Sequence, residues 1–129
     1  MFMRHIVEGY KALNEKNIIH RDIKPANILL KQGIAKLTDF GFSRVVDDPQ
    51  KSQKLTLLGT PLYTAYEILN GHQFNSKCDV WSMGIVFYEM LHVKTPWTGT
   101  DLQNLNENIK NKKVEFKSTI NPEIKSLII

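Results

Sequence analysis

An eight-residue polar stretch, His20–Asn27 (His-Arg-Asp-Ile-Lys-Pro-Ala-Asn), constrains the fold of this 129-residue chain more than any other feature. Apolar residues flank the stretch, at positions 18–19 before it and 28–30 after it. Pro25 fixes its own backbone φ angle and removes one hydrogen-bond donor, which stiffens the stretch. Polar loops held by buried segments often carry catalytic or binding residues. The sequence therefore predicts a rigid loop that carries chemistry between two buried segments.

Four motifs in this order resemble the C-terminal lobe of a protein kinase catalytic domain. His20–Asn27 matches the catalytic-loop pattern H-R-D-x-x-x-x-N, and Asp39-Phe40-Gly41 matches the metal-binding D-F-G pattern. Residues 59–63 (Gly-Thr-Pro-Leu-Tyr) are similar to the loop that receives the substrate peptide. Asp79-x-Trp81-x-x-Gly84 is similar to the central helix of the lobe. Each motif alone is a weak signal, but the combination is specific.

The resemblance covers residues 1–129 and implies an α+β fold, mainly α-helical, that comprises the C-terminal lobe only. Helices and a short β-hairpin would carry the catalytic and metal-binding loops. No G-x-G-x-x-G loop, strand lysine or helix glutamate of the N-terminal lobe occurs in these residues. We therefore expect residues 1–129 to form a partial kinase domain, whose partners are the N-terminal lobe of the same kinase and a protein substrate with a serine or threonine acceptor.

Local sequence patterns predict several helices and one hairpin. Apolar residues at helical spacing predict helices over about 2–17, 77–91 and 101–111, and the 77–91 helix is apolar nearly all round. Residues 28–31 and 34–38 predict two strands joined by a two-residue turn. Residues 42–58 predict a loop. The expected helix ends are a Thr64–Glu67 capping box, a glycine C-cap at Gly71, an N-cap at Ser76 and an N-cap at Asn121.

The resemblance implies roles in phosphoryl transfer for several polar residues of the loops. Asp22 would be the catalytic base, Lys24 would neutralise charge on the γ-phosphate, and Thr60 would bond to both. Asn27 and Asp39 would bind Mg²⁺, for which hard oxygen ligands are suited. Considered alone, each of these residues is more often a turn or surface residue. The cofactors implied are ATP and Mg²⁺, and Lys24 and Leu29 would also contact the nucleotide, with Leu29 forming the floor under the adenine ring.

Structural and regulatory roles are implied for six further positions. His20 and Phe40 would pack beneath the site, and Asp79 would hold the backbone of the catalytic loop. Glu67, in the place of the A-P-E glutamate, would be buried and would pair with an arginine beyond residue 129. Arg21 could pair with a phosphate on Thr56, the candidate phosphosite in the activation segment.

Composition excludes several other classes of protein. The net charge is 17 − 13 = +4, and no dense Lys/Arg block indicates nucleic-acid binding. The lone Cys78 cannot form an internal disulfide, which favours a reducing compartment. We expect the cytoplasm, and the nucleus is compatible with the same observation. No apolar run approaches the length needed to span a bilayer, so no membrane partner is expected.

Two alternatives to an active kinase lobe stay open at the level of sequence. A kinase-derived regulatory or docking fragment without turnover would keep the same motifs, and the missing N-terminal lobe favours inactivity of these 129 residues alone. A nucleotide-binding protein of another class has little support, because neither a Walker nor a Rossmann glycine motif is present.

Overall fold

The computed structural model describes residues 1–48 and 61–128 of the chain. Its helices and strands confirm the mainly helical α+β class that the sequence predicts. Their bounds are α1 Phe2–Asn14, β1 Ile18–Ile19, β2 Ile28–Lys31, β3 Ile34–Leu37, β4 Arg44–Val45, α2 Tyr66–Leu69, α3 Lys77–His92, α4 Leu102–Asn111 and α5 Pro122–Ile128, with short 3₁₀ turns at Pro25–Asn27 and Pro61–Tyr63.

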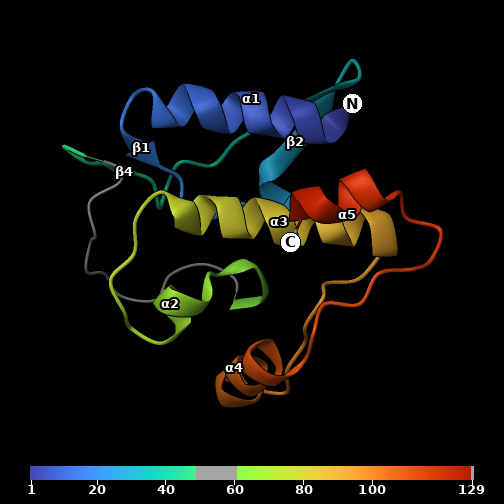
Figure 1. The fold of residues 1–129 in the computed structure, drawn as a ribbon. Helices are drawn as coiled ribbons and strands as arrows, with labels where there is room; N and C mark the ends of the chain where they lie inside the picture. Colours follow the sequence, from blue (N-terminus) through green and yellow to red (C-terminus); the bar gives the residue numbers. More distant parts are fainter. Residues whose placement is uncertain (49–60, 129) are drawn as a thin grey trace.

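Helices α1 and α3 form the two main layers around the core. Figure 1 shows α1 above α3, with β2 running from between them past α1, against which β3 packs, and with α5 beside the later turns of α3. The main apolar cluster joins residues of α1, the catalytic loop, β3 and α3, namely Ile6, Ile23, Ala35, Met83, Val86 and Phe87. Because Ile23 is fully buried within this cluster, the polar loop is anchored through its own apolar residue.

The β2–β3 hairpin agrees with its prediction from the sequence. The two strands are antiparallel, and Ile28 is paired with Leu37. Gln32 and Gly33 form the turn with φ angles of 50° and 76°, the left-handed values that a type I′ turn requires. The hairpin therefore brings its two ends, where the metal-binding residues are expected, to the same place.

A second, very short pair of strands was not predicted. β1 and β4 are antiparallel, with Ile18 paired to Val45 and Ile19 paired to Arg44. The prediction of an irregular loop over residues 42–58 is therefore wrong at its beginning, and positions 49–58 lie outside the described residues. Two-residue strands are too short to show an alternating pattern, so sequence periodicity could not reveal them.

The N-terminal caps of two helices differ from the prediction. The N-cap residue of α2 is Ala65, which makes no side-chain cap bond, so the helix begins one residue later than the capping box predicted for Thr64 and Glu67 requires. Ser76 makes no side-chain cap bond to α3. Instead, Asn75 Oδ1 accepts a hydrogen bond from the first backbone N–H of that helix at 3.0 Å. Asn75, one position before Ser76, thus provides the side-chain cap that was predicted for Ser76.

Other helix ends are confirmed. Gly71 has a φ angle of 68° after α2, as expected for a C-terminal glycine. Asp101 Oδ1 accepts from the Asn104 N–H at 2.8 Å and caps α4. Asn121 Oδ1 accepts from the Glu123 N–H at 2.7 Å and caps α5. Helix α1 ends at Asn14, earlier than predicted.

Helix α3 is less uniformly buried than its composition predicts. Its middle residues are in the core, but Val80 and Met90 are 49% and 44% exposed. Helix α1, helix α5 and the 3₁₀ turn at Pro61–Tyr63 each contact part of α3, and Val80 and Met90 are among the residues of this helix that stay exposed. Among the helices at positions 1–48 and 61–128, none is long and apolar enough to cross a bilayer.

Candidate active site

The predicted catalytic loop brings Asp22, Lys24 and Asn27 into direct contact. Asn27 Nδ2 donates to both the backbone oxygen and Oδ2 of Asp22, at 2.8 Å each. Lys24 Nζ lies 3.0 Å from the same Oδ2. The side chain of Asn27 can reach back because Pro25 begins a 3₁₀ turn that Asn27 ends. Asp22 and Asn27 are both buried.

These contacts orient the Asp22 carboxylate. An amide and an ammonium group both hold Oδ2. We expect an incoming hydroxyl group to donate a hydrogen bond to the other oxygen, Oδ1. A general base must be held within hydrogen-bond reach of the proton that it accepts, so a fixed carboxylate suits this chemistry. The ammonium of Lys24 places a positive charge beside the same position.

Asn27 and Asp39 lie at the two adjacent ends of the hairpin. The Thr38 N–H donates to the Asn27 backbone oxygen at 3.0 Å, which closes this end of the ladder. Asp39 has a φ angle of 61°, a left-handed conformation that Asp tolerates better than most residues. Its Oδ1 accepts from the Gly41 N–H at 3.1 Å. The hairpin therefore places Asn27, which contacts Asp22, and Asp39 at neighbouring strand ends.

This donor set fits Mg²⁺. Because Nδ2 of Asn27 donates to Asp22, the atom of that amide that can bind a cation is Oδ1. Asp39 supplies a carboxylate from the neighbouring strand end. Within the described part of the chain no cluster of three or more His, Cys, Asp or Glu side chains forms a richer site. Mg²⁺ is commonly held by one or two carboxylates, with water and substrate phosphates as its other ligands.

Asp79 attaches the catalytic loop to α3. Its Oδ2 accepts from the His20 N–H and its Oδ1 from the Arg21 N–H, both at 2.8 Å. Asp79 is completely buried, and burial raises the pKa of its carboxyl group, while the two backbone donors act in the opposite direction. Arg21 adopts a φ angle of 66°, so the loop turns sharply where Asp79 holds it.

The rings of His20 and Phe40 are adjacent but differ in burial. His20 is completely buried, and its Nε2 lies 3.1 Å from the Thr38 carbonyl oxygen, which makes Nε2 the donor. The Phe40 ring centroid lies 5.2 Å from that of His20. Phe40 is nevertheless 50% exposed, so its prediction as a core residue is wrong for this chain. The ring lies against His20 and leaves half of its surface uncovered.

Leu29 and Glu67 also lie on open or partly open surface. Leu29 is 58% exposed on β2, and its expected contact with an adenine ring stays a prediction. Glu67 lies in the first turn of α2 and is only half-buried, so the prediction of a fully buried carboxylate is wrong. A helix as short as α2 leaves the side chains of its first turn near solvent.

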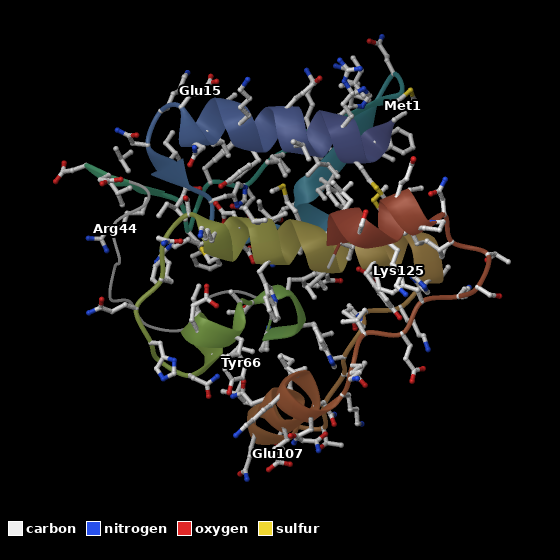
Figure 2. All side chains as sticks on the ribbon, in the orientation of Figure 1. Met1, Glu15, Arg44, Tyr66, Glu107 and Lys125 are labelled. Atoms are coloured by element: carbon white, nitrogen blue, oxygen red, sulfur yellow. The ribbon has the colours of Figure 1, made fainter. Side chains whose placement is uncertain are left out.

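Arg21 of the catalytic loop and Arg44 of β4 lie in the same region, because β4 pairs with β1 just before that loop. Arg21 Nε donates to the Phe42 backbone oxygen at 2.6 Å. Burial lowers the pKa of Arg21, and the positive charge of Arg44 acts in the same direction. Arg44 was missed from the sequence because only the unpredicted strand β4 brings it here. In Figure 2 Arg44 lies on the side of the molecule opposite Lys125.

Two predicted site residues cannot be placed. Thr56, the candidate phosphosite, and Thr60, expected to bond to Asp22 and Lys24, lie outside the described residues. Asn27 and Lys24 contact Asp22 directly. Asp39 follows the neighbouring strand end, and its part in the site stays a prediction. His20 and Arg21 are held by Asp79.

The sequence is similar to those of known proteins along its whole length. The sequence profile of the protein kinase domain matches residues 1–129. The chain is 38% identical over 131 aligned residues to serine/threonine-protein kinase atg1 of Dictyostelium discoideum, an alignment covering 98% of the chain and 19% of that relative. It is 41% identical over 117 residues to cAMP-dependent protein kinase type 3 of Saccharomyces cerevisiae, covering 90% of the chain and 28% of the relative.

A third relative, serine/threonine-protein kinase SKM1 of Saccharomyces cerevisiae, is 43% identical over 100 residues, covering 77% of the chain and 15% of the relative. The chain thus spans less than a third of the length of each of these curated relatives. Because the domain profile matches the whole chain, the chain belongs to the protein kinase family.

Proposed function

We propose that this member of the protein kinase family transfers the γ-phosphoryl group of ATP to serine or threonine hydroxyl groups of protein substrates. One observation carries the proposal: the buried Asp22 carboxylate is held by both Asn27 and Lys24. Phosphoryl transfer depends mainly on positioning and charge stabilisation, and this arrangement supplies both.

Each residue of the site has a distinct part in the proposed reaction. Asp22 orients the substrate hydroxyl group and accepts its proton as the oxygen attacks the γ-phosphorus, while the bond from that phosphorus to the β–γ bridging oxygen breaks and ADP leaves. Lys24 offsets negative charge on the transferred group. Asn27 and Asp39 would hold Mg²⁺, which neutralises charge on the phosphates when bound. Leu29 offers an exposed apolar side chain to the adenine ring.

The regulatory proposal concerns Arg21 and Thr56. Strand pairing sets Arg44 opposite Ile19, two residues before Arg21, so two positive charges are available to an anion in this region. A phosphate on Thr56 would satisfy this charge and order the activation segment. We propose a cytoplasmic protein that acts together with an N-terminal lobe. A docking fragment without turnover is the competing function.

Replacing the proposed base tests this function. Asp22→Ala should lower kcat by about 10²–10⁴-fold in a protein that carries these residues within a complete kinase domain, because a general base contributes an effect of that order. The affinity for Mg·ATP should change little, because Asp22 is not one of the proposed metal ligands.

The matched control is Asp47→Ala, which removes an exposed aspartate outside the proposed site. It should leave kcat unchanged. An Asp22→Ala protein that phosphorylates a peptide at the parental rate would show that Asp22 is not the base. A parental protein that binds Mg·ATP without any turnover would support the docking function instead.

A further inference from the structure

We propose that a second pocket, at the C-terminal end of α3, binds a compact polyanion carrying two or more phosphate groups. The pocket lies between this end of α3 and the chain that leads from α4 to α5, with a volume of about 540 Å³. In Figure 1 this connection returns past the late turns of α3. The proposal is independent of the phosphoryl-transfer site, and its test does not measure catalysis.

The floor of the pocket is aromatic. Tyr88 and His92 are stacked with ring centroids 4.0 Å apart, and both are buried. The Phe116 ring meets them edge-on, with centroid distances of 5.4 Å and 5.5 Å. These three rings form a packed aromatic cluster that supports the pocket from below.

Side chains of α3 and of the loop after it fix the opposite wall by hydrogen bonds to its backbone. Tyr88 OH donates to the Glu115 oxygen at 2.7 Å, and Trp97 Nε1 donates to the Lys112 oxygen at 2.9 Å. The Lys117 N–H donates to His92 Nε2 at 3.2 Å. Since Nε2 accepts, the hydrogen of the ring is on Nδ1, which donates to the Tyr88 backbone oxygen at 3.0 Å. The segment is thus held without regular secondary structure.

The lining of the pocket is strongly basic. It includes Lys94, Lys112, Lys113 and Lys117 but a single acid, Glu115, so the local charge is 4 − 1 = +3. All four lysines are exposed. No ion pair recorded between described residues involves any of them. Like charges held around one cavity repel each other, and a polyanion would relieve this repulsion.

The shape and charge of the pocket favour a compact ligand. A volume of about 540 Å³ lies in the range of sites for small molecules. Lysine binds phosphate as a point charge, and several lysines around a cavity suit several phosphate groups better than one planar carboxylate. The ligand chemistry is therefore that of a polyphosphorylated small molecule, either free or as the headgroup of a membrane lipid.

The pocket is separate from the proposed catalytic site. Asp79, near the start of α3, holds the catalytic loop, whereas His92 ends the same helix. Thirteen helical residues at a rise of about 1.5 Å each place the two ends about 20 Å apart along the helix. A ligand in the pocket would therefore not occupy the Asp22 site.

Calorimetric titration of the 129-residue chain with inositol hexakisphosphate tests the proposal. We expect saturable binding that weakens as salt is raised, because exposed lysines are screened. Lys113→Glu combined with Lys117→Glu should weaken binding at least about tenfold, because it places like charges against the ligand. Lys31→Glu combined with Lys36→Glu on the hairpin is the matched control and should change the affinity by less than about twofold.

Further variants and a vesicle titration separate the effect of charge from misfolding and identify the form of the ligand. The double variant Lys113→Arg with Lys117→Arg keeps both charges and should keep the affinity. If the double glutamate variant does not show the far-ultraviolet circular dichroism of a folded chain, Lys113→Gln with Lys117→Gln takes its place. Vesicles of phosphatidylcholine with and without phosphatidylinositol bisphosphate distinguish a lipid headgroup from a free ligand. Each of three results would overturn the proposal. The pocket and hairpin variants could lose affinity for inositol hexakisphosphate equally, the parent could fail to bind it, or a polyglutamate peptide could bind more tightly than it does.

Discussion

The carboxylate of Asp79 accepts hydrogen bonds from the backbone N–H groups of His20 and Arg21, at 2.8 Å each, across 59 and 58 residues of sequence. A central helix therefore holds the backbone of the catalytic loop directly. The side chains of Asp22 and Asn27 then need only local contacts to reach their positions. The position of the site thus depends on a long-range contact, whereas its internal geometry is local.

Asp79→Asn should destabilise the chain by about 1–3 kcal/mol. An asparagine has one oxygen, so one buried N–H would face an amide NH₂ group and lose its acceptor, and an unsatisfied buried group costs about that much. Urea unfolding followed by circular dichroism measures the change. Asp101→Asn is the control, because asparagine caps a helix as well as aspartate does. Equal losses in both variants would contradict the role of Asp79.

Asp39→Ala should abolish most of the Mg²⁺-dependent part of nucleotide binding in a protein with the complete kinase domain. The substitution removes the one carboxylate of the expected metal pair and leaves Asn27 in place. Titration with ATP in the presence and absence of Mg²⁺ separates the metal effect from direct nucleotide contacts. An unchanged affinity for Mg·ATP would exclude Asp39 as a ligand.

Val93→Gly should stabilise the chain by about 1 kcal/mol. Val93 is 89% exposed and ends α3 with φ 60° and ψ 21°, a left-handed conformation that is strained for a β-branched residue. Glycine adopts this conformation without that strain. Thermal unfolding measures the gain, and Val7→Gly within α1 should instead lower stability because glycine is a poor helix former. A loss of stability in Val93→Gly would contradict the strain.

Tyr63→Phe should change how stability depends on alkaline pH. The Tyr63 hydroxyl donates to Glu89 Oε2 at 2.8 Å. Burial raises the pKa of Tyr63 to about 12, and the hydrogen bond and charge of Glu89 act in the same direction. The folded pKa is above the unfolded value of about 10, so the stabilising effect is complete below pH of about 10 and is lost as the pH rises toward 12.

The measurement for Tyr63 is the difference in unfolding free energy between the parent and the Phe variant. It should be constant from neutral pH to about pH 10 and should fall above that value. At neutral pH it should not exceed about 1 kcal/mol, because the hydroxyl group is partly open to solvent. A difference that does not change between pH 7 and 12 would show that the Glu89 contact does not govern the ionisation of Tyr63.

Much of the local structure follows from the sequence alone. The hairpin turn at Gln32-Gly33, the glycine end at Gly71 and the cap at Asn121 each need a particular residue type at a particular place, and such short-range requirements are readable from neighbouring residues. The Asp22–Asn27 contact is likewise contained in eight residues. The spacing of these motifs was also sufficient to indicate the kinase family.

Only the tertiary structure decided which distant segments meet. The pairing of β1 with β4 placed Arg44 near Arg21, and two-residue strands leave no pattern by which to predict such a pair. The exposure of Phe40 depends on what covers it, which no local pattern records. The lysine-rich pocket likewise exists because bonds from Tyr88, His92 and Trp97 fix a distant irregular segment against the end of α3. Sequence periodicity reports which face of an element is apolar, but burial and charge clustering are set by the partners that the whole chain brings to that face.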